Sequence, residues 1–177
     1  MNQAEIDKHK SIPLSDSDVL KLVENKANVL VYSDLQKYNT LDEALGPHGA
    51  IFLLYETQPD YGHWTCMFKM DDGKTIEFFD PYGIFPDNQL EWVPKNFREV
   101  SGQMYPQLTA LLYYSPYNLT YNEHKFQKKG AGINTCGRWS ALRLVCRDMS
   151  LKKFAEIFKH EDADDLVSII TSYDLDY

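Results

Sequence analysis

Short apolar runs bounded by turn residues characterise the first half of the chain. The segments Ala50–Glu56, His63–Met70 and Thr75–Phe79 predict three strands, and the shorter run Ala27–Tyr32 predicts an extended segment. Apolar stretches of this length, rich in aromatic and β-branched residues, are typical of buried strands. The first half of the chain is therefore expected to supply a sheet.

Helical signals lie on both sides of these strands. Near the N-terminus, Ser15 precedes a helical pattern over Asp16–Asn25, and Leu41–Leu45 predicts a helical turn that Gly46-Pro47 ends. Three further helices are expected near the C-terminus: one that begins at Cys136, one over Leu151–Lys159 capped by Ser150, and one through Ile170 capped by Asp162.

The order of elements predicts the fold class. Helix, antiparallel strands and then helices indicate an α+β fold with a central antiparallel sheet packed against helices. No linker divides the chain, so residues 1–177 are expected to form one domain, with the charged residues 1–13 flexible or loosely docked. The segment Tyr105–Tyr114 is compatible with either a helix or a strand.

Composition excludes several classes of protein. The chain has 26 Asp+Glu against 18 Lys+Arg, a formal charge of -8, which disfavours non-specific binding to nucleic acid. No apolar run approaches the ~18–20 residues that a membrane span needs, and the polar N-terminus does not resemble a secretory signal. Three cysteines cannot all pair within the chain, which disfavours a disulfide framework and favours an intracellular, non-secreted protein.

A predicted hairpin brings a histidine and an aspartate together. If Asp72-Gly73 forms a two-residue turn, His63 lies opposite Tyr82, and Asp80 is its diagonal neighbour on the same face. Diagonal pairs are about 7–8 Å apart at the backbone, which two side chains can bridge. Glu77 has the opposite parity and is expected to point away.

This pair offers an oriented general base. A carboxylate on the Nδ1 atom of an imidazole fixes its tautomer and stabilises the imidazolium. The alternative is that His63 is an ordinary packed or surface residue and that Asp80 only begins the turn at Pro81.

Cys136 is the candidate nucleophile. It stands at the start of a predicted helix, where unpaired N–H groups and the helix dipole favour a thiolate, and Arg138 adds positive charge. Gly137 would leave room for a substrate backbone. Cys66 lies within a strand and Cys146 within a helix, so both are expected to be packed core thiols.

Thioester chemistry also needs donors for an oxyanion. The backbone N–H of Cys136 is one, and a side-chain amide from Gln127, Asn122 or Asn134 is a candidate for the second. The residues alone do not choose among the three.

Four motifs in order resemble a known family. They are Gly62-His63-Trp64, then Phe79-Asp80-Pro81-Tyr82-Gly83, then Gln127, then Thr135-Cys136-Gly137-Arg138-Trp139. Together they resemble the clan CE cysteine peptidases, which include adenain and the ubiquitin-like-protein (SUMO) proteases, and whose order of residues is a circular rearrangement of that of papain. Leu14-Ser15-Asp16-Ser17-Asp18 with Tyr32-Ser33-Asp34-Leu35 is most similar to capsid-maturation proteases of large DNA viruses and virophages.

The resemblance implies a role for each residue. Cys136 would be the nucleophile, His63 the base, and Asp80 the group that orients His63. Gln127 would complete the oxyanion hole, although its distance along the chain from Cys136 is longer than is usual in the family. Trp64 would pack beside the catalytic pair and, with Gly137, border a narrow substrate tunnel.

The implied function is a cysteine endopeptidase of viral maturation. It would cleave capsid precursors at small residues, in the host cytoplasm or viral factory, and could be packaged in the virion. No cofactor or membrane partner is expected, the acidic charge disfavours the DNA activation of adenain, and an activating peptide is left open. The alternatives are an isopeptidase acting on ubiquitin-like conjugates and a non-catalytic peptide-binding module. A metal site of His63, Cys66 and Cys136 is disfavoured because the first two point to opposite faces of a strand.

Overall fold

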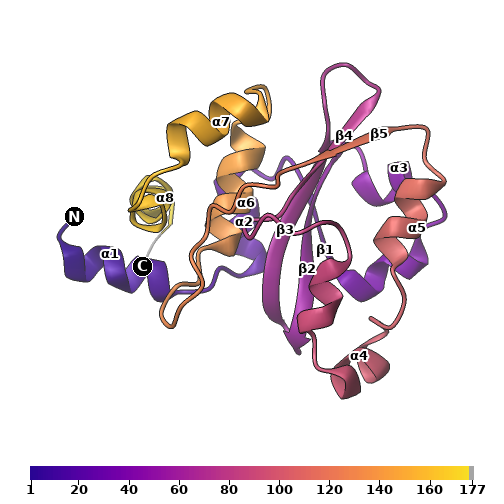
Figure 1. Ribbon diagram of the computed structural model, residues 1–177, viewed down its shortest axis with the longest axis horizontal. Coiled ribbons are helices and arrows are strands. Elements are labelled where there is room, and N and C mark those ends of the chain that lie inside the picture. Colours follow the sequence, from indigo (N-terminus) through magenta and orange to yellow (C-terminus); the bar gives the residue numbers. More distant parts are fainter. Residues whose placement is uncertain (176–177) are drawn as a thin grey trace.

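The computed structural model describes residues 1–175. Within them, five strands form one mixed sheet in the order β1-β2-β3-β4-β5, and helices cover both of its faces (Figure 1). The strands are β1 (Asn28–Val31), β2 (Ala50–Gln58), β3 (Tyr61–Lys69), β4 (Thr75–Phe79) and β5 (Asn118–Tyr121). This confirms the α+β class.

The centre of the sheet is antiparallel, as expected, and its two edges are not. β2, β3 and β4 pair antiparallel, whereas β1 pairs parallel with β2 and β5 pairs parallel with β4. The parallel edges arise because chain segments with helical turns separate each edge strand from its partner, and such long crossovers let a strand enter in the same direction. Strand β5 gives no clear apolar signal, since its side chains are only partly buried.

The helices form two layers. One face of the sheet carries α2 (Asp16–Leu22), α6 (Cys136–Val145), α7 (Leu151–Phe158) and α8 (Ala163–Ser172). The other carries α3 (Leu41–Leu45), α5 (Gln107–Tyr113) and two 3₁₀ helices, η1 (Tyr32–Lys37) and η2 (Asn88–Trp92), with α4 (Lys95–Ser101) at one end (Figure 1). Every helix among residues 1–175 is too short or too polar to cross a bilayer.

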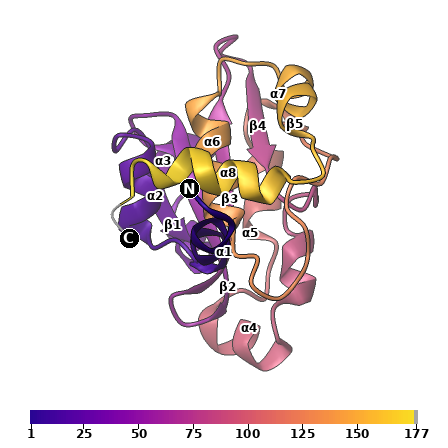
Figure 2. The same cartoon turned by 90° about the vertical axis from the view of Figure 1, so that its left-hand side faces the viewer.

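The N-terminal segment differs from its expected loose packing. Residues Gln3–Ser11 form helix α1, which Asn2 and Glu5 cap reciprocally. It lies against α8 (Figure 2), where Lys10 forms an ion pair with Asp165 at 2.6 Å. Ile6 is the one apolar residue of this helix that is buried, and the ion pair adds a polar contact, so the apolar pattern alone does not predict the docking.

Local signals place the remaining elements close to their expected bounds. Ser15 and Asp18 form a capping box at α2, and Ser150 accepts a hydrogen bond from the amide of Lys153 at the start of α7. Helix α2 ends before the expected Asn25, because Glu24 and Asn25 both adopt positive φ angles. The undecided segment around Tyr105–Tyr114 contains helix α5.

Candidate active site

The hairpin of β3 and β4 has the expected register. Cys66 pairs with Phe79 and Lys69 with Ile76. The His63 and Asp80 side chains meet at the open end of this hairpin, where His63 Nε2 lies 2.9 Å from Asp80 Oδ1. Glu77, of opposite parity, points to the other face and binds Arg143 of α6.

The His63 ring presents the opposite nitrogen to Asp80 from the one expected from the sequence. Asp80 contacts Nε2 rather than Nδ1, because it lies diagonally across the hairpin and reaches the far end of the ring. Nδ1 is therefore the ring nitrogen left for the Cys136 thiol. Burial lowers the pKa of His63, but the charge and hydrogen bond of Asp80 and the hydrogen bond to Cys136 outweigh it and raise the pKa to about 10.

Hydrogen bonds fix both the carboxylate and the backbone of Asp80. Its Oδ1 also accepts from the amide of Tyr82, and its Oδ2 accepts from Gln89 Nε2 at 2.8 Å. Asn122 accepts from the Asp80 amide and donates to the Asp80 carbonyl. Gln89 carries no signal in the sequence, since it lies on the short helix η2 in a segment without periodicity.

Close packing fixes His63 from two further directions. The ring of Tyr82 stacks on the His63 ring at 4.6 Å, with an angle of 13° between the planes. The preceding residue, Gly62, passes so near β2 that a Cβ there would lie 2.0 Å from the carbonyl oxygen of Tyr55. Glycine at this position therefore lets β3 carry His63 to the sheet end.

Cys136 is the first residue of α6, as expected, and is 8% exposed. The other two thiols differ from it. Cys66 is fully buried and points to the carbonyl of Ser140, and burial raises its pKa well above the ordinary value. Burial likewise raises the pKa of Cys146. Both are packed thiols on or against α6, away from His63.

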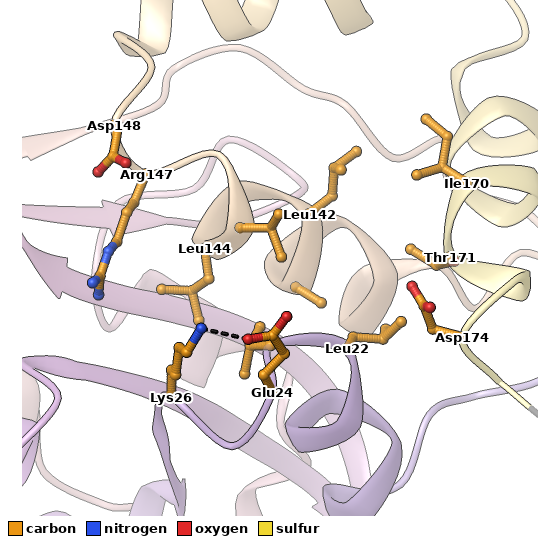
Figure 3. Close-up of a pocket in the computed structure, with 13 residues that line it drawn as sticks. Leu22, Glu24, Lys26, Leu142, Leu144, Arg147, Asp148, Ile170, Thr171 and Asp174 are labelled. Atoms are coloured by element: carbon orange, nitrogen blue, oxygen red, sulfur yellow. Dashed lines mark hydrogen bonds and ion pairs between the residues drawn. The ribbon is translucent and has the colours of Figure 1, made fainter.

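His63, Cys136, Gln89 and Gln127 line one cavity of about 350 Å³. Its other walls are mostly aromatic and aliphatic, with Tyr55, Tyr61, Tyr82 and Trp92 among them. The Lys129 ammonium lies 3.8 Å from the centre of the Trp92 ring and 5.2 Å from that of Tyr82, so it joins the two walls. A larger cavity of about 400 Å³ lies between α2, α6 and α8 (Figure 3), but none of the residues 1–175 that line it is a cysteine or histidine.

The three candidate amides have different surroundings. Gln127 lines the cavity, its Nε2 donates to the Ile133 carbonyl at 3.3 Å, and its buried Oε1 accepts no hydrogen bond from residues 1–175. Asn134 also lines the cavity but binds the Ser11 carbonyl and the Tyr61 hydroxyl. Asn122 is occupied with Asp80 and His124, which removes it from the candidates.

Trp64 and Gly137, for which a place beside the substrate was expected, pack against each other. They are absent from the described residues that line the cavity. Trp64 is 3% exposed and donates to the Leu14 carbonyl. A Cβ on Gly137 would lie 3.1 Å from both Trp64 Cδ1 and Leu14 Cβ. The small size of Gly137 therefore serves close packing of α6 on β3, next to Cys136.

Comparison with known proteins gives a family but no function. The chain is 43% identical over 173 residues to the uncharacterized protein V9 of Sputnik virophage, and the alignment covers 94% of this chain and 98% of V9. The chain belongs to the V9 family. No protein-family model matches it.

Two solved structures are more distantly similar to this V9-family protein. SUMO protease Ulp1, with its catalytic cysteine oxidised to a sulfinic acid, is 14% identical with a TM-score of 0.39, over 93% of this chain and 80% of that one. The central domain of the uncharacterized Lpg1148 protein from Legionella pneumophila is 13% identical with a TM-score of 0.41, over 91% and 94%. Both likenesses are too distant to assign chemistry, which rests on the side chains of the site.

The raised pKa of His63 predicts a pH dependence of stability. Because its pKa is about 10 in the fold and about 6.5 in an unfolded chain, the protonated ring stabilises the fold. This contribution is complete below pH ~6.5 and is lost as the pH rises through about 10. Urea unfolding of wild type and His63→Ala should show a difference in unfolding free energy that shrinks from pH 6 to pH 10. A constant difference would show that His63 contributes by packing alone.

Proposed function

We propose that this protein is a cysteine endopeptidase that cleaves viral protein precursors. The observation that carries the proposal is His63 held between Asp80 and a cysteine at the first turn of α6. A histidine pKa of about 10 keeps the ring protonated at neutral pH, so an imidazolium lies beside Cys136, the pairing that activates a cysteine nucleophile. Neither a packed histidine nor a peptide-binding module needs this arrangement.

The residues account for each step of the reaction. The Cys136 sulfur attacks the carbonyl carbon of the scissile amide, and the carbonyl π electrons move to its oxygen. The Cys136 amide and Gln127 Nε2 donate to that oxyanion. As the C–N bond breaks, His63 gives its proton to the departing amine and a thioester remains. His63 then takes a proton from water, the hydroxide displaces the Cys136 sulfur, and the acid product leaves.

The cavity suits an extended peptide with small residues beside the scissile bond. Its volume of about 350 Å³ is small, and the Trp92–Lys129 contact joins its walls next to Tyr82. Membership of a virophage family supports a virion precursor as the substrate. Cleavage of ubiquitin-like conjugates is the alternative within the same chemistry.

N-terminal sequencing of candidate virion precursors tests the proposal. Precursors are incubated with wild type and with Cys136→Ala, and a panel of ubiquitin-like conjugates is treated in parallel. New N-termini that appear only with wild type, next to small residues, are expected. Rapid cleavage of a conjugate without cleavage of any precursor would replace the endopeptidase proposal by the isopeptidase.

A further inference from the structure

A buried carboxylate on α8 contacts both ends of the loop that leads to the nucleophile. Asp164 is 4% exposed, in the first turn of α8. Its Oδ2 accepts from the backbone amide of Lys128 at 2.8 Å, and its Oδ1 accepts from Thr135 Oγ1 at 2.5 Å and from Trp139 Nε1 at 3.0 Å. Lys128 follows Gln127, and Thr135 precedes Cys136.

Other contacts also hold the loop, since Gln127 Nε2 donates to the Ile133 carbonyl and Asn134 Nδ2 donates to the Ser11 carbonyl. Residues 128–132 are exposed, whereas Gln127, Thr135 and Cys136 at its ends are buried. The Gln127 amide donates to the Pro81 carbonyl at 3.0 Å, which anchors this end beside the Asp80 turn. Asp164 then joins this anchored end to the start of α6. We call its three contacts, with Lys128, Thr135 and Trp139, the Asp164 clamp. Asp164 is therefore the side chain that bonds both ends of the loop and bridges the two candidate oxyanion donors, alongside the Gln127–Ile133 hydrogen bond.

Only a carboxylate can make these three contacts at once. Asp164 accepts from donors on both of its oxygens, whereas an asparagine has a single acceptor oxygen and a nitrogen that cannot accept. Helix α8 also contacts α6 at a second point, away from the loop. There Thr171 Oγ1 accepts a hydrogen bond from Arg138 Nη1 at 2.8 Å. Unlike the Thr171–Arg138 contact, the Asp164 contacts join α8 to the loop at Lys128 as well as to α6 at Trp139.

We propose that Asp164 is a positioning residue that sets the distance between Gln127 and Cys136, so that α8 takes part in forming the oxyanion site. The inference rests on the proposed peptidase function. It also explains how Gln127, nine positions before Cys136 in the chain, is held in the same cavity as Cys136.

The test compares Asp164→Asn with Thr171→Val. Asp164→Asn should lower kcat by about 10- to 100-fold with KM within about twofold, since loss of one oxyanion donor typically lowers kcat by about 10²–10³-fold. Thr171→Val removes a buried α8–α6 contact that does not involve the loop. It should lower the melting temperature without lowering kcat. If Asp164→Asn does not fold, Thr135→Val removes one end of the clamp and should give a smaller fall in kcat.

The outcomes separate this inference from the proposed function. An equal effect of Asp164→Asn and Thr171→Val on kcat would overturn the positioning role. If wild type cleaves no precursor or conjugate, the proposed function fails, and amide hydrogen exchange over residues 127–135 still decides whether the clamp exists. Faster exchange in Asp164→Asn but not in Thr171→Val supports the clamp, and unchanged exchange in both contradicts it.

Discussion

Cys136→Ala is expected to abolish precursor cleavage and to leave the protein folded. Removal of a catalytic nucleophile typically lowers kcat by about 10⁴- to 10⁶-fold. The change deletes one sulfur atom from a side chain that is already small and 8% exposed, so a loss of about 1 kcal/mol of stability is expected. Turnover is measured on a precursor-derived peptide, and folding by urea unfolding.

The turnover of the Cys136→Ser and His63→Ala variants should be close to the low turnover of Cys136→Ala. Because these residues act as a unit, a second substitution adds little once the first has been made. Cys146→Ala is the matched control, since this thiol lies at the end of α6 away from His63. It should retain wild-type turnover. Near wild-type turnover by Cys136→Ser, or alkylation of Cys136 no faster than that of free cysteine, would contradict the assignment.

Glu77→Gln is expected to destabilise the fold by about 3–5 kcal/mol, the typical cost of breaking a buried ion pair. Both side chains of the Glu77–Arg143 pair are almost completely buried, and two hydrogen bonds of 2.6 and 2.9 Å join them. Arg143 also donates to the carbonyls of Cys146 and Met149 and lies over the rings of Phe68 and Phe154. Loss of the carboxylate charge leaves the guanidinium without a counterion inside this cluster. Urea unfolding at pH 7 measures the effect.

Two comparisons make this prediction specific. Glu99→Gln alters the exposed Lys95–Glu99 pair, 4.0 Å apart on α4, and should change stability by less than about 0.5 kcal/mol. The double variant Glu77→Gln/Arg143→Met should recover part of the loss, because no buried charge is left unpaired. A loss within 1 kcal/mol for Glu77→Gln would show that water reaches the guanidinium. Since Arg143 belongs to α6, this pair also fixes the helix that carries Cys136 against β4.

The amino-acid sequence determined the elements whose cause is local. Turn residues at Asp72-Gly73 and period-two alternation suffice for the hairpin register, and the register places His63 and Asp80 on one face. A helix start at Cys136 and capping at Ser15 and Ser150 likewise depend on neighbouring residues. The identities of Cys136, His63 and Asp80 as candidates therefore needed no tertiary information.

Contacts between distant segments were decided only by the tertiary structure. The parallel edge strands, the docking of α1 on α8 and the clamp at Asp164 join residues far apart in the chain, and no periodicity encodes which polar groups meet. The imidazole orientation and the place of Gln89 on Asp80 also depend on directions of approach in space. The same holds for Trp64 and Gly137, for which the motif predicted contact with a substrate and which pack against each other where α6 meets β3.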